Sequence, residues 1–197
     1  MMEEVDYHVT HPPLIKGKLM ENILNVTYAQ TGQSTVQKNM GMREMQARAF
    51  EQRNSPYLLI KAPPASGKSR ALMFLGLDKL INQGIRKVIV AVPEMSIGSS
   101  FRDTALTHYG FFADWKVEPA NNLCISGGEK GKVAAFQRFM RDDSQILVCT
   151  HATLRIAFDS LDVAVFDNCL VAIDEFHHVS ADEKSRLGSL LDALMKL

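Results

Sequence analysis

Short runs of apolar residues alternate along this chain with longer stretches in which apolar side chains recur at helical spacing. The short runs, which predict strands, lie at residues 57–60, 88–92, 123–125, 146–149 and 169–173. The stretches that predict helices lie at residues 42–52, 69–83, 130–140 and 184–197, with further helices expected to begin near residues 96–100 and after Thr153. Strands that alternate with helices are typical of an α/β fold with a doubly wound, mostly parallel sheet.

The run Val-Ile-Val-Ala-Val at residues 88–92 contains no polar residue, which suits a strand that is covered on both faces. In parallel sheets the carboxyl ends of the strands form the ligand-binding edge, and the distinctive polar clusters of this sequence fall on that edge. Residues 1–41 lack a sustained period and are predicted to be an N-terminal extension, with one candidate strand at residues 23–28. Residues 42–197 are predicted to be the main domain.

Composition narrows the class of protein only modestly. The 197 residues are 46% hydrophobic and 22% charged, as in an ordinary globular protein. The formal net charge of zero neither supports nor excludes a nucleic-acid partner, because a local basic stripe can hide in the average. The three cysteines lie in apolar runs without C-x-x-C spacing, which indicates buried thiols in a reducing compartment rather than a zinc site. An acidic N-terminus and the lack of a long apolar run lead us to expect a cytoplasmic protein with no membrane partner.

The segment Lys-Ala-Pro-Pro-Ala-Ser-Gly-Lys-Ser-Arg at residues 61–70 lies between a predicted strand and a predicted helix. This order predicts a phosphate cradle, in which backbone N–H groups and a helix N-terminus point at one anion. Lys68 is then expected at the β- and γ-phosphates, and the Ser69 hydroxyl suits Mg²⁺. The backbone around the phosphates would be that of Pro64, Ala65, Ser66 and Gly67. Alone, the segment is also compatible with a turn and helix cap, because Ala62 stands where the pattern G-x-x-x-x-G-K-[S/T] has glycine.

The strand predicted at residues 169–173 ends in two adjacent carboxylates, Asp174 and Glu175. Nucleotide hydrolysis needs one acidic group to hold the water shell of Mg²⁺ and another to orient and deprotonate the attacking water. An isolated Asp-Glu pair is also compatible with a helix cap, but this pair falls on the same predicted edge as the phosphate loop. Lys68, Asp174 and Glu175 are therefore the candidate catalytic residues, and Ser69 and Asp174 are the candidate metal ligands.

The loop A-x-x-x-x-G-K-S at residues 62–69 and the sequence D-E-x-H at residues 174–177 resemble motifs I and II of the superfamily-two helicases and translocases. This is the DEAD/DEAH class that includes type I and type III restriction motor subunits. The resemblance implies a RecA-like P-loop NTPase domain that binds ATP and Mg²⁺. The segment M-R-E-M-Q at residues 42–46 is similar to the L-R-x-Y-Q segment of the family, which makes Gln46 the candidate contact to adenine. His177 would couple the ATP site to a partner domain.

Three further segments resemble family elements that touch the nucleic-acid backbone. They are residues 90–100, Ser-Gly-Gly at residues 126–128 and Thr-His-Ala-Thr-Leu at residues 150–154. The candidate nucleic-acid contacts are Ser99, Gly128, Thr150 and Thr153, whose targets would be phosphates rather than bases. The same residues are equally compatible with turns and helix caps.

Ala65 departs from the family pattern, because many members have a second loop glycine at this position. If the loop demands a positive φ there, an alanine is strained. The resemblance also implies an S-A-T element and a second RecA-like domain with an arginine finger, neither of which follows in these 197 residues. We therefore expect a fragment of a longer motor or an unusually short relative. Because an arginine finger is worth about 10³ to 10⁵ in rate, we expect this chain alone to hydrolyse ATP weakly.

Two functions stay open at this point. The first is the ATPase domain of a helicase or translocase that moves on nucleic acid, with DNA preferred to RNA and a restriction-modification setting implied by the resemblance. The second is an ATP-dependent switch or assembly module that does not translocate. A GTPase is disfavoured because the sequence has no N-K-x-D motif, and a small-molecule kinase is disfavoured by the D-E-x-H strand. Stimulation of the ATPase by nucleic acid separates the two functions.

Overall fold

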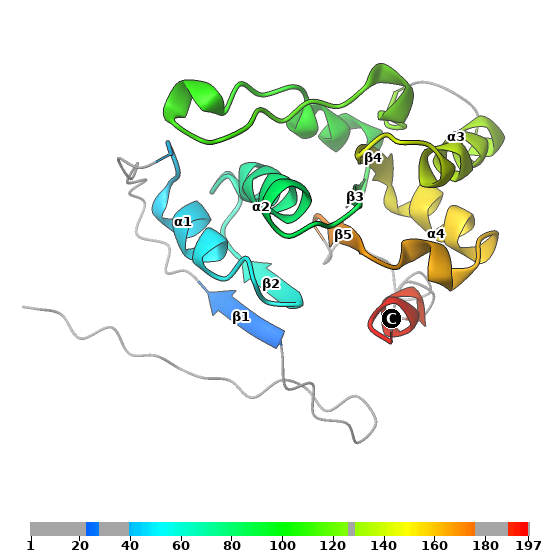
Figure 1. The fold of residues 1–197 in the computed structure, drawn as a ribbon, viewed down its shortest axis with the longest axis horizontal. Coiled ribbons are helices and arrows are strands. Elements are labelled where there is room, and N and C mark those ends of the chain that lie inside the picture. Colours follow the sequence, from blue (N-terminus) through cyan, green and yellow to red (C-terminus); the bar gives the residue numbers. More distant parts are fainter. Residues whose placement is uncertain (1–22, 28–39, 126–128, 176–188, 197) are drawn as a thin grey trace, which may run out of the picture.

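The computed structural model describes residues 23–27, 40–125, 129–175 and 189–196. The strands are β1 (Ile23–Thr27), β2 (Tyr57–Lys61), β3 (Lys87–Val92), β4 (Ile146–Thr150) and β5 (Cys169–Ile173). The α-helices are α1 (Glu44–Glu51), α2 (Lys68–Asn82), α3 (Glu129–Arg141) and α4 (His151–Asp159), and residues 189–194 are also helical. Strands and helices alternate from β2 onward (Figure 1), so the predicted α/β fold is confirmed.

Every strand pairing in the described residues is parallel. β3 lies between β4 and β5, so that Val90 faces Val148 on one side and Ala172 on the other. β2 pairs with β1 in a second sheet. Part of the predicted N-terminal extension therefore joins the domain through backbone pairing, while the domain boundary at residue 42 stays a prediction.

The central strand β3 is buried along its whole length. The unbroken apolar run at residues 88–92 predicts this burial, and Lys87 at the start of the strand is also buried. Its side chains alternate between two faces of the sheet, and each face is covered by helices. On one face Val88 and Val90 share a core with Phe74 of α2. On the other face Ile89 and Ala91 share a core with residues of α3 and α4, which include Phe136, Phe139 and Leu154. Cover on both faces is the doubly wound arrangement.

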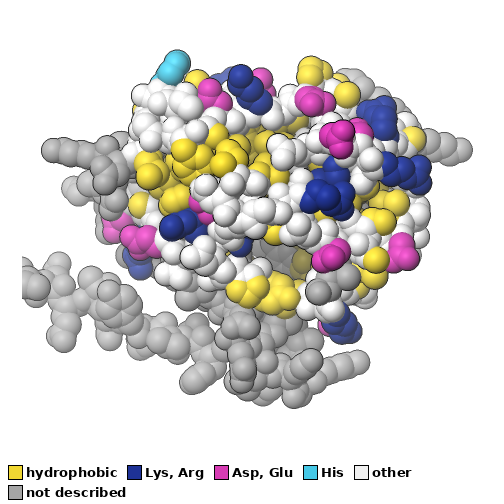
Figure 2. Space-filling model, in the orientation of Figure 1, with side chains coloured by type: hydrophobic (Ala, Val, Ile, Leu, Met, Phe, Trp, Pro, Cys, Tyr) yellow, Lys and Arg dark blue, Asp and Glu magenta, His cyan; other side chains and the backbone are white. Residues whose placement is uncertain are grey.

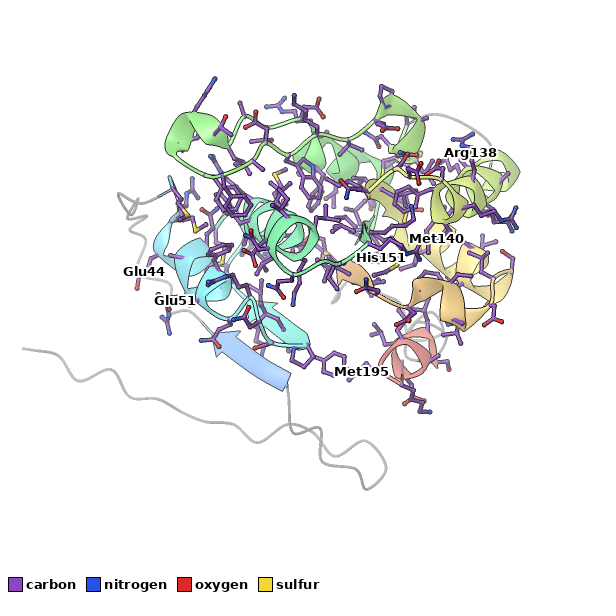
Figure 3. All side chains as sticks on the ribbon, in the orientation of Figure 1. Glu44, Glu51, Arg138, Met140, His151 and Met195 are labelled. Atoms are coloured by element: carbon purple, nitrogen blue, oxygen red, sulfur yellow. The ribbon has the colours of Figure 1, made fainter. Side chains whose placement is uncertain are left out.

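Helix α2 places Lys68 and Ser69, at the end of the phosphate loop, relative to this core. It begins directly after Gly67 and ends at Asn82, close to the predicted end. Gly84 has a φ of +69°, and Ile85 N donates to Lys79 O at 3.0 Å, which is the glycine-terminated helix end that satisfies the last carbonyls. Helix α1 lies beside α2, and its exposed ends are marked by Glu44 and Glu51 in Figure 3.

Two sequence predictions are wrong in detail. Residues 123–125 do not form a strand, because only Asn122 makes an isolated bridge to Val148 and the chain then turns. The helix expected near residues 96–100 is a 3-10 helix, η1 (Met95–Phe101). Leu123 and Cys124 are buried and serve local packing instead, whereas Ile125 is exposed. No helix among the described residues has the length and apolar character needed to cross a membrane.

Candidate nucleotide-binding site

The phosphate loop connects β2 to α2 and contains two residues in the left-handed backbone region. Gly67, which precedes the first turn of α2, has a φ of +91°, and Ala65 has a φ of +59°. Ser66 N donates to Pro63 O at 3.3 Å, which closes the turn. The sequence left open whether an alanine in this loop meets a positive φ, and the structure shows that it does.

The Lys68 side chain contacts both the phosphate loop and the end of β5. Its Nζ donates to the carbonyl oxygens of Ala62 at 3.3 Å and Pro63 at 3.4 Å. The same Nζ lies 3.2 Å from Glu175 Oε1, in a pair that retains some exposure to solvent. The ammonium group thus joins the loop to the end of β5, in the place where a phosphate would need a cation.

Helix α1 supports the loop from the other side. Arg43 Nη1 donates to Ala65 O at 3.0 Å, and Gln46 Nε2 donates to Gly67 O at 3.0 Å. Gln46 is only 2% exposed, and its Oε1 accepts a bond from Arg43 N at 2.8 Å. A Cβ at Gly67 would lie 2.4 Å from Gln46 Nε2, so a larger residue would displace the Gln46 amide, and the φ of +91° independently favours glycine. The predicted adenine contact of Gln46 stays a prediction.

The acidic pair lies at the carboxyl end of β5. Asp174 N donates to Ala91 O of β3 at 2.8 Å, which extends the sheet pairing by one residue. The Asp174 carboxyl is buried, and Ser69 Oγ lies 3.5 Å from its Oδ2. Glu175 N donates to Asp174 Oδ1 at 3.0 Å, and Glu175 itself has a φ of +51°. The end of β5 and the start of α2 therefore bring together the four side chains that the sequence assigned to the site.

Electrostatics at Asp174 match a site built for a cation. Burial raises the pKa of the Asp174 carboxyl, and the neighbouring Glu175 carboxylate raises it further. Lys68 and the Ser69 hydroxyl act in the opposite direction. A divalent cation next to Asp174 would favour the ionised carboxylate that burial disfavours.

The residues present fit ATP and Mg²⁺. Ser66 Oγ is buried and has no hydrogen-bond partner among the described residues, although it lies within the loop that would surround the phosphates. A phosphate oxygen would give this hydroxyl an acceptor. A carboxylate and a hydroxyl are oxygen ligands of the kind that Mg²⁺ prefers, and Asp174 and Ser69 supply them.

The remaining sequence candidates occupy different positions. Thr150 caps α4, since its Oγ1 accepts from Thr153 N at 3.2 Å, and the two hydroxyls lie 3.0 Å apart. Thr153 is 0% exposed, so both hydroxyls serve the helix cap in this structure. Ser99 lies in η1, is exposed and donates to Ser96 O at 2.8 Å. Gly128 and His177 lie outside the described residues, and nucleic-acid contacts at all these positions stay predictions.

Two side chains at the site had no assigned role in the sequence prediction. Arg43 holds the loop carbonyl of Ala65, and its only signal was its place beside Gln46 in the α1 segment. His151 Nε2 lies 3.0 Å from the carbonyl oxygen of Asp174. A carbonyl only accepts, so Nε2 carries the proton and donates to it. The feature of the sequence that could have pointed to His151 is its position directly after β4, on the predicted ligand-binding edge.

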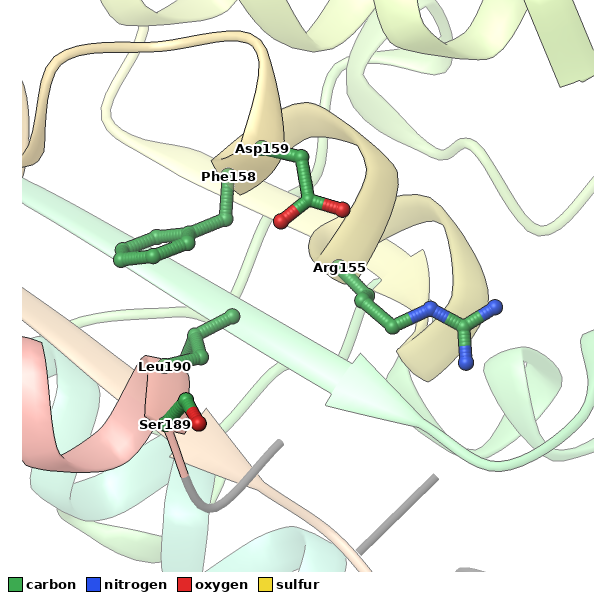
Figure 4. A pocket seen from close by; sticks show the side chains of 5 residues that line it. All are labelled: Arg155, Phe158, Asp159, Ser189 and Leu190. Atoms are coloured by element: carbon green, nitrogen blue, oxygen red, sulfur yellow. The ribbon is translucent and has the colours of Figure 1, made fainter. Parts of the chain in front are cut away.

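A small cavity lies apart from these residues. It has a volume of about 190 Å³ and is lined by Arg155, Phe158 and Asp159 of α4 together with Ser189 and Leu190. Figure 4 shows the two groups of side chains facing one another across it. None of the candidate ATP-site residues lines this cavity, so it is not part of the phosphate site.

Comparisons with known proteins agree with the two motifs. The sequence pattern of the DEAD/DEAH box helicase family matches residues 43–196. A protein of Bacillus subtilis (strain 168) named "Putative ATP-dependent helicase YeeB" is 68% identical over 176 residues, which are 89% of this chain and 29% of that protein. The chain thus spans less than a third of the length of this relative. No solved structure matches the chain significantly. The family match covers most of the chain and includes both the phosphate loop and the acidic pair, so the chain belongs to the DEAD/DEAH box helicase family.

Proposed function

We propose that this chain is the first RecA-like ATPase domain of a helicase or translocase that couples ATP hydrolysis to movement on nucleic acid. The main support for the proposal is that side chains of the phosphate loop contact side chains at the end of β5. Lys68 Nζ lies 3.2 Å from Glu175 Oε1, and Ser69 Oγ lies 3.5 Å from Asp174 Oδ2. A phosphate-binding cation and two carboxylates in contact are what phosphoryl transfer to water requires.

Each residue has a distinct role in the proposal. Lys68 and the loop backbone of residues 64–67 would bind the phosphates. Ser69 and Asp174 would hold Mg²⁺, which would supply positive charge to the phosphate oxygens. Glu175 orients a water molecule and accepts its proton, acting as the general base. Gln46 contacts adenine. Because Lys68 pairs with Glu175 and two loop carbonyls in this structure, phosphate binding would exchange those contacts for phosphate oxygens and release Glu175 for the water.

The proposed coupling to nucleic acid depends on residues outside the phosphate site. The relative's name describes a helicase, and the family match includes the segments that resemble nucleic-acid-binding elements. Contacts to phosphates are proposed at Ser99, Gly128, Thr150 and Thr153, with DNA as the preferred substrate. His177 is proposed to couple the site to a second RecA-like domain in the complete protein.

Replacing Glu175 with glutamine in the full-length protein tests the chemistry. We expect the Glu175→Gln protein to turn ATP over about 10²-fold more slowly than the wild type, because the general base is lost. It should bind ATP at least as well, because Lys68 loses a carboxylate that competes with the phosphates. Steady-state phosphate release and fluorescent-nucleotide titration measure the two quantities. The matched control is Glu51→Gln at the exposed end of α1, which should leave both unchanged. Wild-type turnover in Glu175→Gln would overturn the assignment.

A second measurement separates a motor from a switch. A motor should show ATPase stimulation by single- or double-stranded DNA and ATP-dependent displacement of a bound protein or strand. ATP hydrolysis that neither DNA nor RNA stimulates would favour the switch or assembly module. Stimulation by RNA in preference to DNA would correct the expected substrate.

A further inference from the structure

Tyr109 is an aromatic residue that contacts two residues next to the phosphate-loop site, Arg70 and Gly41. It nevertheless remains 56% exposed to solvent. It lies in η2 (Thr107–Tyr109), within the segment that runs from β3 past α1 and α2 (Figure 1). The guanidinium Cζ of Arg70 lies 4.7 Å from the ring centroid. A Cβ on Gly41 would lie 2.5 Å from Tyr109 Cβ, so the backbone there packs directly on the side chain. The ring therefore packs against Arg70 and the Gly41 backbone while much of its surface faces solvent.

Arg70 lies close to this ring and to a second one. It is in the first turn of α2, and its Cζ is 5.8 Å from the centroid of Phe74 as well as 4.7 Å from that of Tyr109. Its Nε and Nη2 atoms are buried without a hydrogen-bond partner among the described residues. Buried guanidinium N–H groups without acceptors are costly, and each such group in a native structure requires an explanation. An acceptor supplied by a ligand is one such explanation.

Both supports of Tyr109 belong to elements that shape the phosphate loop. Arg70 follows Gly67 by one helical turn. Gly41 leads into α1. Arg43, which caps this helix, and Gln46 within it donate to the loop carbonyls of residues 65 and 67. Hydrophobic side chains gather on the surface between α1, α2 and the segment that follows β3 (Figure 2). The ring and the loop are thus parts of one connected surface.

We propose that Tyr109 is the stacking platform for the base of the bound nucleotide and that Arg70 supports it from behind. This inference rests on the proposed ATP binding and assigns a nucleotide-recognition role to the segment between β3 and α3. The tyrosine offers an apolar face to a purine ring, and the cation on its other side orders the ring. A small movement of the ring would let the unpaired Arg70 N–H groups donate to acceptor atoms of the base or ribose. Tyr109 then contributes to affinity for the nucleoside part of ATP and not for its phosphates.

The test compares ATP with inorganic triphosphate in the full-length protein. Tyr109→Ala should weaken ATP binding about tenfold, since stacking of one base on an aromatic side chain contributes an effect of about this size, and should leave the affinity for triphosphate unchanged. Arg70→Met, which keeps an apolar stem close to both rings, should show the same selective loss. Tyr109→Trp should keep ATP affinity, and its indole fluorescence should change on adding ATP but not triphosphate. Phe112→Ala, at an exposed aromatic residue of the same segment, is the matched control and should change neither affinity.

The outcomes distinguish this inference from the proposed function. Equal affinity of Tyr109→Ala and wild type for ATP would overturn the platform while leaving ATP binding intact. An equal loss for ATP and triphosphate would also overturn it, because the effect would then be on the loop or on folding. Normal ATP binding combined with a loss of affinity for single-stranded DNA would overturn it and place the ring in a nucleic-acid interface. If the wild type binds neither ATP nor triphosphate, the proposed function fails and the platform fails with it.

Discussion

Replacing Ala65 with glycine tests whether the phosphate loop is held in a strained conformation. Ala65 has a φ of +59°, and the left-handed region costs a residue with a Cβ roughly 1–2 kcal/mol. Glycine removes that cost but adds about 0.4–1 kcal/mol through the greater freedom of the unfolded chain. The bond from Arg43 Nη1 goes to the backbone carbonyl of residue 65, so the substitution retains it. We expect Ala65→Gly to stabilise the domain by about 0.5–1 kcal/mol, the difference between these two effects.

Ala62, three residues earlier in the same loop, provides the matched control. It is not among the residues with positive φ, and it packs against the cluster of Met45, Ala49 and Ala71. Ala62→Gly therefore relieves no strain. This substitution should lower the free energy of unfolding by about 0.4–1 kcal/mol, because glycine gives the unfolded chain more conformational freedom. Loss of the partly buried methyl group should lower it by up to about 0.8 kcal/mol more. The two Ala→Gly substitutions should thus differ by roughly 2 kcal/mol in their effect on stability and have opposite signs.

Denaturant unfolding of the full-length protein measures this difference. The relevant transition is the one whose midpoint rises when ATP and Mg²⁺ are added, because a ligand stabilises the folded form of the domain that binds it. The free energy of unfolding is compared for the wild type and both variants without nucleotide. If Ala65→Gly destabilises this transition as much as Ala62→Gly does, the positive φ of Ala65 carries no strain and the reasoning is refuted.

Three further predictions follow from buried groups in the same domain. Without nucleotide or metal, Asp174→Asn should stabilise the protein near neutral pH. Burial and Glu175 raise the pKa of Asp174 in the folded state, so the stability of the wild type falls as the pH rises from the unfolded pKa of Asp174 to its folded pKa. The gain should shrink as the pH is lowered toward about 4, and a gain independent of pH would contradict this cause. Thr150→Ala should cost about 1 kcal/mol of unfolding free energy through loss of the α4 cap, whereas Thr150→Ser should cost less. Gly98→Ala should destabilise by about 1–3 kcal/mol, because its Cβ would lie 2.4 Å from Cys124 Cβ, whereas Gly131→Ala in α3 meets no atom within 4 Å and should stabilise slightly; equal effects would contradict the packing argument.

The sequence by itself was enough to select the candidate residues of the site, whose chemical roles stay predictions. The roles predicted for Lys68, Ser69, Asp174 and Glu175 depend on residue type and on position at the carboxyl end of a strand, which are local properties of the chain. The structure brings these four side chains together. The burial of β3 was equally predictable, because an unbroken apolar run has few alternatives to a covered strand.

The tertiary structure alone decided which supporting side chains from other segments join these four. Arg43 reaches the loop carbonyl of Ala65, and Tyr109 packs on Arg70 and Gly41, although no spacing in the sequence links these positions. Residues 123–125 have strand-like composition but form a turn in which Leu123 and Cys124 are buried and Ile125 is exposed. Local propensity cannot decide such cases, because strand pairing and side-chain contacts depend on which other segments arrive at the same place. The positive φ of Ala65 belongs to the same class, since closure of the loop against α1 and α2 imposes it against the residue's own preference.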